Sequence, residues 1–367
     1  MKFYCDGTNL SNAANTVSKA LAVNKNIPIL EGIKLEASEN KLTLSAYNQE
    51  IYIEKTIPAE IYEPGELVVN GKILADYANK ISNKEKIEIS QSFNNKLNIK
   101  IGKSYSELNY YEVQNFPDLG EYDDEVSVTM KQSDLKELLD RAIFCVSMND
   151  NRLLLKSCNL EMKGDSLEAV CLDGFRVGIG RKVPVSKKGD FKCIILGKII
   201  SDIIKILDDS DDEVVISKYN NMVIFDLGAT KIRTTTVEGE FYKYENSLPK
   251  NIKTEVIIDK NQLEECLIRA SIISRENYYN AITIDIDENI MNIVADSEKG
   301  RVDENIDCKT TGEPMKITLN NKYLLEAVNR IKEDFMKIEF EGSVRPILVT
   351  KTDGDEFRSI ILPVRIV

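Results

Sequence analysis

The segment NGKILADYANK (residues 70–80) decides the fold, because it recurs as LGKIISDIIKI (196–206) and as NNKYLLEAVNR (320–330). The lysines Lys72, Lys198 and Lys322 of the three segments lie 126 and 124 residues apart. Two more landmarks repeat in the same order with nearly the same period: Leu10, Leu135 and Leu263, and then Leu42, Leu167 and Met291. This period is too long for a solenoid and has the length of a small domain. The sequence therefore predicts three tandem copies of one domain.

Length and composition are compatible with three ordinary domains. The chain has 367 residues, of which 43% are hydrophobic, and this is enough for several cores. The N-terminus MKFYCDGTNL has no apolar signal region, and no run approaches the ~18 apolar residues that a membrane helix needs. The seven cysteines form no C-x-x-C motif. We expect a cytoplasmic protein whose thiols are reduced and buried.

The absence of histidine excludes much catalytic chemistry. There can be no Ser-His-Asp or Cys-His pair, no H-E-x-x-H zinc site and no histidine general base. The acidic run at 208–213 lacks the glycine of a calcium loop, so it is predicted to be a solvated loop. Gly102-Lys103-Ser104 lacks the first glycine of a phosphate loop, and Gly178-Ile179-Gly180 lacks the third glycine of a dinucleotide fingerprint. We therefore predict no catalytic residue, no metal and no cofactor.

Each copy is predicted to begin with a short strand and a helix that buries one face. The apolar residues of this first helix follow the i, i+3, i+4, i+7 pattern, at Leu10, Ala13, Ala14 and Val17, at Leu135, Leu138, Leu139 and Ala142, and at Leu263, Cys266, Leu267 and Ala270. In the third copy, Asn261 and Glu264 have the spacing of a capping box. Alternating stretches such as KLTLSA then indicate strands with one buried face.

A second helix is predicted at each repeated lysine, and alternating strands follow it. Its predicted apolar positions are Ile73, Leu74, Tyr77 and Ile81, then Ile199, Ile200, Ile203 and Leu207, then Tyr323, Leu324, Val328 and Ile331. Each copy is thus an α+β domain with two helices packed on antiparallel sheet. Proline and charge interrupt the apolar pattern near Pro117 and Pro249. The predicted domains are 1–122, 123–250 and 251–367.

Three motifs carry a resemblance to a known family: NIPILEGIKLE (26–36), LDGFRVGIGR (172–181) and IILPVRIV (360–367). With the order and spacing of the segments, they resemble the bacterial DNA polymerase III β subunit, the sliding clamp, over the whole chain. The resemblance implies a head-to-tail homodimer that closes a ring of six domains, with sheets outside and helices facing a hole for double-stranded DNA. The implied role is processivity rather than catalysis. The implied partners are the catalytic subunit of DNA polymerase III, the clamp loader, and other polymerases and repair proteins.

The resemblance also implies an apolar pocket between the second and third domains that binds short peptides of these partners. Such a pocket suits a peptide anchor, because desolvated side chains supply most of the affinity. Four positions depart from the family pattern and leave the peptide preference open, namely Leu172, Tyr242, Asn246 and Ser247. The implied pocket residues are Leu155, Leu172, Gly174, Phe175, Arg176, Val177, Tyr242, Tyr278, Asn320, Tyr323, Val344, Pro346, Ile360, Leu362, Pro363, Val364 and Arg365.

A third implication is a DNA-facing surface on the helices. The net charge of −12 argues against a protein that grips DNA tightly, whereas a topological tether needs only weak positive potential in the hole. Acidic residues share these helices, so on their own the cations would be interpreted as solvated helix faces. The implied DNA-facing residues are Lys25, Lys72, Lys80, Lys136, Arg141, Asn149, Arg152, Lys198, Lys205, Arg269 and Arg330.

The implied dimer contact joins the first domain of one chain to the third domain of another. Ile272 and Ile273 fit the apolar contribution of the third domain, and Tyr105 and Leu108 fit that of the first. Ser106 stands where the family has an aromatic residue, so we expect a dimer that forms but is weaker than usual.

Two other functions remain open at this stage. An enzyme that uses carboxylates or lysine would have a polar interdomain pocket with shifted pKa values. A three-domain protein-binding scaffold that forms no ring would be a monomer without self-complementary edges. The threefold repeat favours a clamp or a scaffold over an enzyme.

Overall fold

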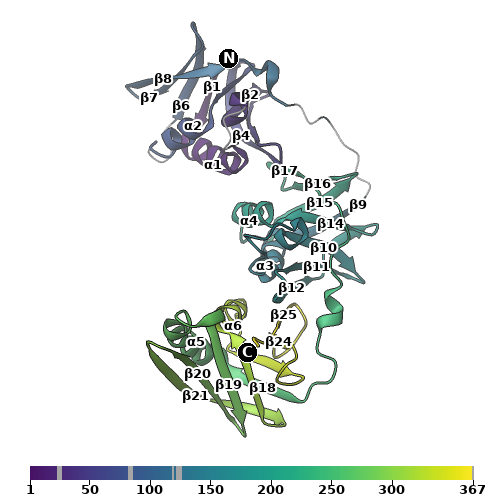
Figure 1. The fold of residues 1–367 in the computed structure, drawn as a ribbon. Coiled ribbons are helices and arrows are strands. Elements are labelled where there is room, and N and C mark those ends of the chain that lie inside the picture. Colours follow the sequence, from purple (N-terminus) through teal and green to yellow (C-terminus); the bar gives the residue numbers. More distant parts are fainter. Residues whose placement is uncertain (23–26, 82–85, 118–119, 121–125, 366–367) are drawn as a thin grey trace. The chain divides into compact units, whose positions relative to one another are not determined.

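The computed structural model describes residues 1–22, 27–81, 86–117, 120 and 126–365 (Figure 1). Lys25, one of the residues expected to face DNA, lies outside the described residues. The chain forms two compact units. Unit 1 comprises Met1–Gln132, Val185–Phe191 and Ser210–Thr236, and unit 2 comprises Ser133–Pro184, Lys192–Asp209 and Val237–Val367. The middle copy of the repeat therefore contributes strands to both units.

The repeat is visible in the order of the elements. The first copy contains β1 (Lys2–Asp6), α1 (Gly7–Val17), β2 (Gly32–Ser38), β3 (Lys41–Tyr47), β4 (Ile51–Glu63), β5 (Gly65–Asn70), α2 (Gly71–Ala78), β6 (Lys86–Ser92), β7 (Lys96–Ile101) and β8 (Ser104–Tyr111). The middle copy contains β9 (Val126–Lys131), α3 (Gln132–Ile143), β10 (Ser157–Lys163), β11 (Ser166–Leu172), β12 (Arg176–Lys182), β13 (Ser186–Lys188), β14 (Lys192–Leu196), α4 (Gly197–Ile206), β15 (Glu213–Tyr219), β16 (Met222–Asp226) and β17 (Thr230–Thr235).

The third copy repeats the same order of elements. It contains β18 (Thr254–Asp259), α5 (Lys260–Ser274), β19 (Ala281–Asp287), β20 (Ile290–Ser297), β21 (Gly300–Gly312), β22 (Met315–Asn320), α6 (Asn321–Val328), β23 (Phe335–Phe340), β24 (Ile347–Lys351) and β25 (Phe357–Ile361). Short 3-10 turns lie at Ser18–Ala20, Pro28–Glu31, Val113–Asn115, Leu153–Lys156, Tyr244–Ser247 and Tyr278–Asn280. The predicted α+β class with two helices in each copy is confirmed.

The first helix of each copy buries the predicted face. All twelve predicted apolar positions of α1, α3 and α5 are buried, and the side chain of Asp6 caps α1 by accepting hydrogen bonds from the amides of Thr8 and Asn9. The predicted capping box at Asn261 is wrong. The N-cap of α5 is Asp259, which accepts a hydrogen bond from the Gln262 amide, so the helix begins at Lys260, before Asn261.

The second helices agree less well with the sequence pattern. In α4 the four predicted apolar residues are buried. In α2 the prediction for Ile73 is wrong, since 53% of its surface is exposed and Leu74, Ala75 and Ala78 form the buried face instead. Asn70 and Asn320 cap α2 and α6 by accepting hydrogen bonds from the amides of Ile73 and Tyr323. The cap places Ile73 in the first turn, on the side away from the core.

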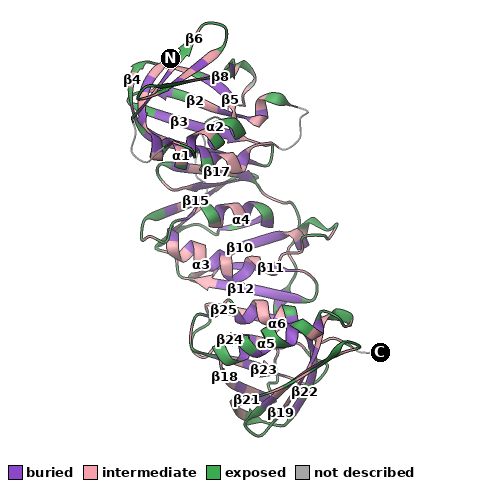
Figure 2. Ribbon diagram, turned by 90° about the vertical axis from the view of Figure 1, so that its left-hand side faces the viewer, coloured by how far each residue is buried: buried purple, intermediate pink, exposed green. Residues whose placement is uncertain are grey.

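Two large antiparallel sheets contain all the strands that the structure describes. Unit 1 has the order β1-β6-β7-β8-β5-β2-β3-β4-β17-β16-β15-β9-β13, and unit 2 has β14-β10-β11-β12-β25-β24-β23-β18-β21-β20-β19-β22. Figure 2 shows that buried residues run through many of the strands, whereas exposed residues lie on the loops and on parts of the helices. One joint in each sheet connects two copies, namely β4 with β17 in unit 1 and β12 with β25 in unit 2.

These two joints follow one rule. If the short strand β13 is set aside, the fourth strands of the copies are β4, β12 and β21, and the eighth are β8, β17 and β25. Each joint pairs the fourth strand of one copy with the eighth strand of the next, and each has five opposed residue pairs. The rule leaves β8 of the first copy and β21 of the third without such a neighbour.

The close approach of α3 to β12 depends on two glycines. A Cβ at Gly180 would lie 2.2 Å from the carbonyl oxygen of Leu138, and one at Gly178 would lie 2.9 Å from that of Ala142. The Gly-x-Gly sequence that resembles part of a nucleotide fingerprint thus allows a helix to pack on the sheet. Similarly, Gly102-Lys103 forms the turn between β7 and β8, where Gly102 has φ 56°.

Candidate peptide pocket, helix surface and strand edges

An apolar cluster in unit 2 lies where the pocket was expected. We call it the pocket cluster, and its members come from the 3-10 turn Leu153–Lys156, from β11, β12 and β25, and from the connection that leads to the third copy. Phe241, Leu248 and Leu348 pack on its edge. The members are Leu155, Val170, Leu172, Val177, Ile179, Tyr244 and Ile360. Because successive side chains of a strand alternate between faces, Val170 with Leu172 and Val177 with Ile179 share one face of the sheet.

An aromatic rim lies at the start of β12, the strand that contributes Val177 to the pocket cluster; Phe175 is exposed, and Tyr323 is half-buried against the core of the third copy. The rings of Phe175 and Tyr323 are stacked with their centroids 6.4 Å apart, and the amide of Leu362 donates to the carbonyl of Phe175 at 2.9 Å. The amide of Val364 donates to the carbonyl of Thr318 at 2.9 Å. The C-terminal segment therefore connects β12 of the middle copy with β22 of the third.

Arg176 holds the two copies together beneath this rim. It is buried, and its guanidinium donates to Asp173, to Glu326 on α6 and to the carbonyl oxygen of Phe144. Its charge also lies 4.3 Å from the centroid of the Tyr323 ring. A buried guanidinium with three acceptors is stable only while all three remain in place, so the turn at 173–176 is fixed relative to α6.

The structure brings together many, but not all, of the expected pocket residues. Leu155, Leu172, Val177 and Ile360 lie in the cluster, and Phe175, Arg176, Tyr323 and Leu362 lie at its rim. The four residues of the rim are not themselves packed on the cluster, and Tyr323 packs on the core of the third copy. Within the described part of unit 2, the other expected residues that are not packed on the cluster are Gly174, Tyr242, Tyr278, Asn320, Val344, Pro346, Pro363, Val364 and Arg365. Of these, Gly174 forms the turn after β11 with φ 91°, and Asn320 is the N-cap of α6.

Sequence reasoning missed Val170, Ile179 and above all Tyr244. The two aliphatic residues carry a sequence signal, since they continue the alternation of Leu172 and Val177 along the same strands. Tyr244 follows no strand or helix pattern. Its burial, with 7% of its surface exposed, comes from the path of the chain between the second and third copies.

The cations expected to face DNA are mostly paired with carboxylates. The ion pairs join Lys136 to Asp209, Arg152 to Asp150, Lys205 to Asp202, Arg269 to Glu304 and Arg330 to Asp140. Asn149 is exposed. Within the described residues Lys72, Lys80 and Lys198 are exposed and have no ion pair. The helix surface therefore has little excess positive charge, as a net charge of −12 suggests.

Arg141 requires a correction, because it is not an exposed cation. Only 4% of its surface is accessible, and its guanidinium pairs with Glu137 at 2.9 Å. Glu137 also pairs with Lys182 and Lys332. Burial raises the pKa of Glu137, but the hydrogen bond from Lys182 and the three positive charges outweigh this effect and lower the pKa. Arg141 thus belongs to an internal charge cluster beside α3.

The residues expected at the dimer contact lie beside two open strand edges. In the described residues 104–109, β8 pairs with β7 alone, and residues 300–307 of β21 pair with β20 alone. Tyr105 is exposed and Leu108 is half-buried on β8. On α5, Ile272 has 67% of its surface exposed, and Ile273 lies 3.5 Å from the position that a Cβ of Gly300 would occupy.

The three copies match three models of one family. The descriptions are DNA polymerase III beta subunit, N-terminal domain for residues 1–120, central domain for 129–243 and C-terminal domain for 245–365. This chain belongs to the family of bacterial β sliding clamps. It is 28% identical to the beta sliding clamp of Staphylococcus epidermidis over 96% of each chain, and 28% identical to that of Halalkalibacterium halodurans over the full length of both.

Solved structures of sliding clamps have the same fold. The sliding clamp of Bacillus subtilis superposes with a TM-score of 0.94 at 25% identity, and that of Pseudomonas aeruginosa bound to griselimycin with 0.95 at 25% identity. Both comparisons cover 100% of each chain. The recognition of the family from the repeat and the motifs is confirmed. The protein functions as a DNA sliding clamp.

Two further findings concern the part of the chain that the structure describes. None of its helices is both long and apolar enough to span a membrane. Its acidic and cysteine residues include no group of three or more arranged to hold a metal ion. All seven cysteines are free thiols, and six of them are buried.

Proposed function

We propose that two copies of the chain close head to tail into a ring around double-stranded DNA, and that the ring tethers the replicative polymerase. The observation that carries this proposal is the joint rule: the fourth strand of one copy pairs with the eighth strand of the next. The strands left over are β21 and β8. We propose that these strands form a third joint of the same kind between two chains, because a heterologous contact of this sort makes a closed ring when the rotation is right.

The joint rule also supports a register for the contact between chains. Each of these strands forms a hairpin with the strand before it, so equivalent residues can be matched by their distance from the hairpin turn. On this basis, residues 104–108 of β8 correspond to 230–234 of β17, and residues 300–304 of β21 correspond to 176–180 of β12. The register would then place Ser104 opposite the partner's Glu304 and Leu108 opposite the partner's Gly300. It would also place Glu107 opposite the partner's Arg301, a pair of opposite charges across the two strands.

The side chains near the open edges support the same contact. Phe144 and Ile272 each lie nine residues after the landmark leucine of their copies. In the joint between β12 and β25, Phe144 packs against Phe357 with the ring centroids 6.4 Å apart. Ile272 has no such cover among the described residues and is 67% exposed. An exposed apolar side chain beside an open edge is suited to a partner subunit.

The proposed role of the pocket cluster is to bind short peptides of polymerases, the clamp loader and repair proteins. The buried aliphatic floor and the rim of Phe175, Tyr323 and Leu362 support this proposal, because a peptide anchor gains affinity by desolvation in such a pocket. The related clamp of Pseudomonas aeruginosa binds griselimycin. The DNA contacts are proposed to be weak and independent of sequence. Among the described residues expected to face DNA, the exposed cations without ion pairs are Lys72 on α2, Lys80 in the turn after it and Lys198 on α4.

We also propose that the protein acts in the cytoplasm, where replication takes place, and that it has no catalytic activity of its own. Domain boundaries at 1–122, 123–250 and 251–367 are supported by the first strands of the second and third copies, β9 at Val126 and β18 at Thr254. The non-ring scaffold is the alternative, and it predicts a monomer.

The test is the retention of the protein on circular and on linearised nicked plasmid, with a clamp loader and ATP present. A ring stays on circles and is lost from linear ends, because its link to DNA is topological. Equal retention on both DNA forms would show that no closed ring is loaded. Sedimentation over a concentration series separates the remaining cases, since a persistent monomer at micromolar concentration favours the scaffold.

A further inference from the structure

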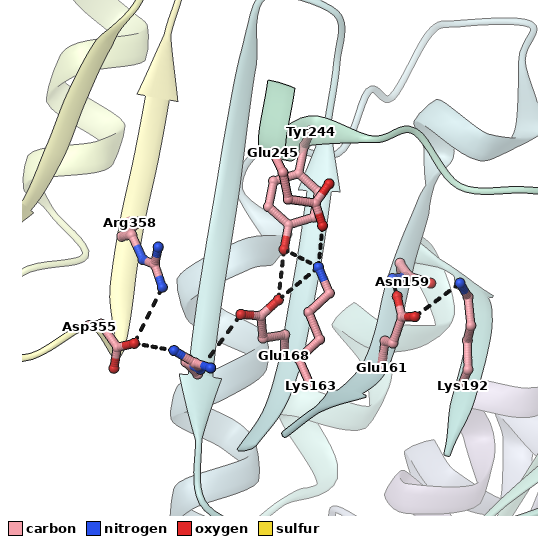
Figure 3. A network of polar contacts seen from close by, with 10 residues as sticks. Asn159, Glu161, Lys163, Glu168, Lys192, Tyr244, Glu245, Asp355 and Arg358 are labelled. Atoms are coloured by element: carbon pink, nitrogen blue, oxygen red, sulfur yellow. Dashed lines mark hydrogen bonds and ion pairs between the residues drawn. The ribbon is translucent and has the colours of Figure 1, made fainter. Parts of the chain in front are cut away.

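A polar network lies at the end of the pocket cluster and involves the buried tyrosine that the sequence did not indicate (Figure 3). The phenol of Tyr244 donates to Glu168 at 2.7 Å. The ammonium of Lys163 donates to the Tyr244 oxygen at 2.7 Å, lies 3.3 Å from Glu168 and also donates to Glu245. These contacts join the connection between the second and third copies to β10 and β11.

The connection around Tyr244 has little structure of its own. The turn Tyr244–Ser247 has no side-chain cap, and two of its backbone hydrogen bonds, from Asn246 and Leu248, are 3.4 and 3.3 Å long. Bonds of this length are weak. The position of the segment therefore depends on the burial of the Tyr244 ring and on the hydrogen bonds of its phenol.

The sheet beneath this segment changes from apolar to charged along its strands. Leu172, Val170 and Glu168 are alternate residues of β11, so they share a face, and Glu168 is opposite Arg181 of β12. Arg181 continues the network to Asp355, which also pairs with Arg358 on β25. Tyr244 lies across the boundary, with its ring on the apolar cluster and its hydroxyl on the charged end.

The charge of Glu168 is an unusual element of this site. Only 5% of the residue is exposed, and a buried carboxylate costs free energy unless its oxygens are paired. Burial and the hydrogen bond to Glu168 raise the pKa of Tyr244, so its phenol stays protonated and donates at neutral pH. Burial lowers the pKa of Lys163, but the hydrogen bonds to Glu245 and Tyr244 outweigh it and raise the pKa, so Lys163 stays charged.

We propose that Tyr244, held by Glu168 and Lys163, is a positioning residue that fixes one wall of the peptide pocket. This inference rests on the proposed peptide-binding role of the pocket cluster. The network holds the segment 241–248 against the cluster, so the wall is in place before a peptide arrives. A pre-organised wall improves affinity because the peptide does not have to order the segment on binding.

The direct test is the variant Tyr244→Phe, which keeps the ring and removes the hydroxyl. The control is Tyr4→Phe in the first copy, because Tyr4 donates to Glu88 at 2.6 Å and Glu88 pairs with Lys2, the same chemistry outside the pocket. The probe is fluorescently labelled griselimycin, titrated with each protein and followed by anisotropy. We expect Tyr244→Phe to weaken binding about fivefold to tenfold and Tyr4→Phe to leave it unchanged.

Hydrogen exchange separates positioning from general destabilisation. In Tyr244→Phe we expect faster exchange of the amides at 244–248, with unchanged exchange in β18–β21. Glu168→Gln retains the shape of the side chain and should likewise weaken probe binding and speed exchange at 244–248. If Tyr244→Phe folds poorly, the same two measurements are made on Glu168→Gln. Wild-type affinity in both variants would overturn the inference alone. A wild-type protein that does not bind the probe would overturn the proposed pocket together with the inference.

Discussion

The joint between β12 and β25 and the open edge of β21 present the same position of the repeat in two states. In the joint, five residue pairs align the strands, and Phe144 packs against Phe357 of the next copy. At the open edge, residues 300–307 pair on one side only, and Ile272 is exposed. The chain supplies the neighbour in the first case and lacks it in the second. The difference between the two positions is the basis for the proposed joint with another molecule.

The largest expected effect comes from a charge at the open edge. Ile272→Asp places a carboxylate where the proposed contact is apolar, and burying an unpaired charge is costly. We expect the dissociation constant of the dimer to rise by about 100-fold or more, which corresponds to about 3 kcal/mol. Sedimentation over a concentration series measures this change. A variant that dimerises like the wild type would show that Ile272 lies outside the contact between chains.

A smaller effect is expected from the equivalent position in the closed joint. Phe144→Ala removes a half-buried ring that packs on the core of the third copy. Because the ring is only half-buried, we expect the free energy of unfolding to fall by about 2 kcal/mol. The measurement is denaturant unfolding, with dimerisation followed in parallel. We expect the dimer to persist. If the variant lost the dimer but kept its stability, Phe144 would contribute to the contact between chains and not to the joint within the chain.

The smallest effect tests the register between chains. Glu107→Lys or Arg301→Glu alone would place like charges opposite each other, and we expect about fivefold weaker dimerisation for each. The double variant should restore the wild-type dissociation constant, because the pair is again of opposite charge. If the two single effects simply add in the double variant, the residues are not opposed and the proposed register is wrong.

The sequence predicted best where periodicity acts alone. The first helices have strong apolar stripes, and every predicted buried position of Leu135 and its neighbours on α3 is buried. The pattern failed at Ile73, because the buried face of α2 consists of Gly71, Leu74, Ala75 and Ala78 at i, i+3, i+4 and i+7, and Ile73 lies outside it. The prediction for Arg141 failed because its ion-pair partner Glu137 also pairs with Lys182 of β12 and with Lys332 after α6. The sequence pattern of α3 does not reveal these contacts.

The pocket illustrates the same limit. Leu155, Leu172, Val177 and Ile360 are apolar residues of regular strands or of the turn before them, and the structure brings them into one cluster. Tyr244 lies in a segment without periodicity, and its partners Lys163 and Glu168 are 81 and 76 residues away in the chain. Contacts of such sequence separation are set by topology, which a single sequence does not display.

The joint rule has a consequence for how the proposed ring responds to concentration. The joints of β4 with β17 and of β12 with β25 are intramolecular, so their strength does not depend on how much protein is present. The proposed joint of β8 with β21 is bimolecular, so dilution would weaken it by mass action. A ring built in this way would open at one of the two contacts between chains. A protein that opens it would have to separate only β8 of one chain from β21 of the other, because no covalent connection joins these strands.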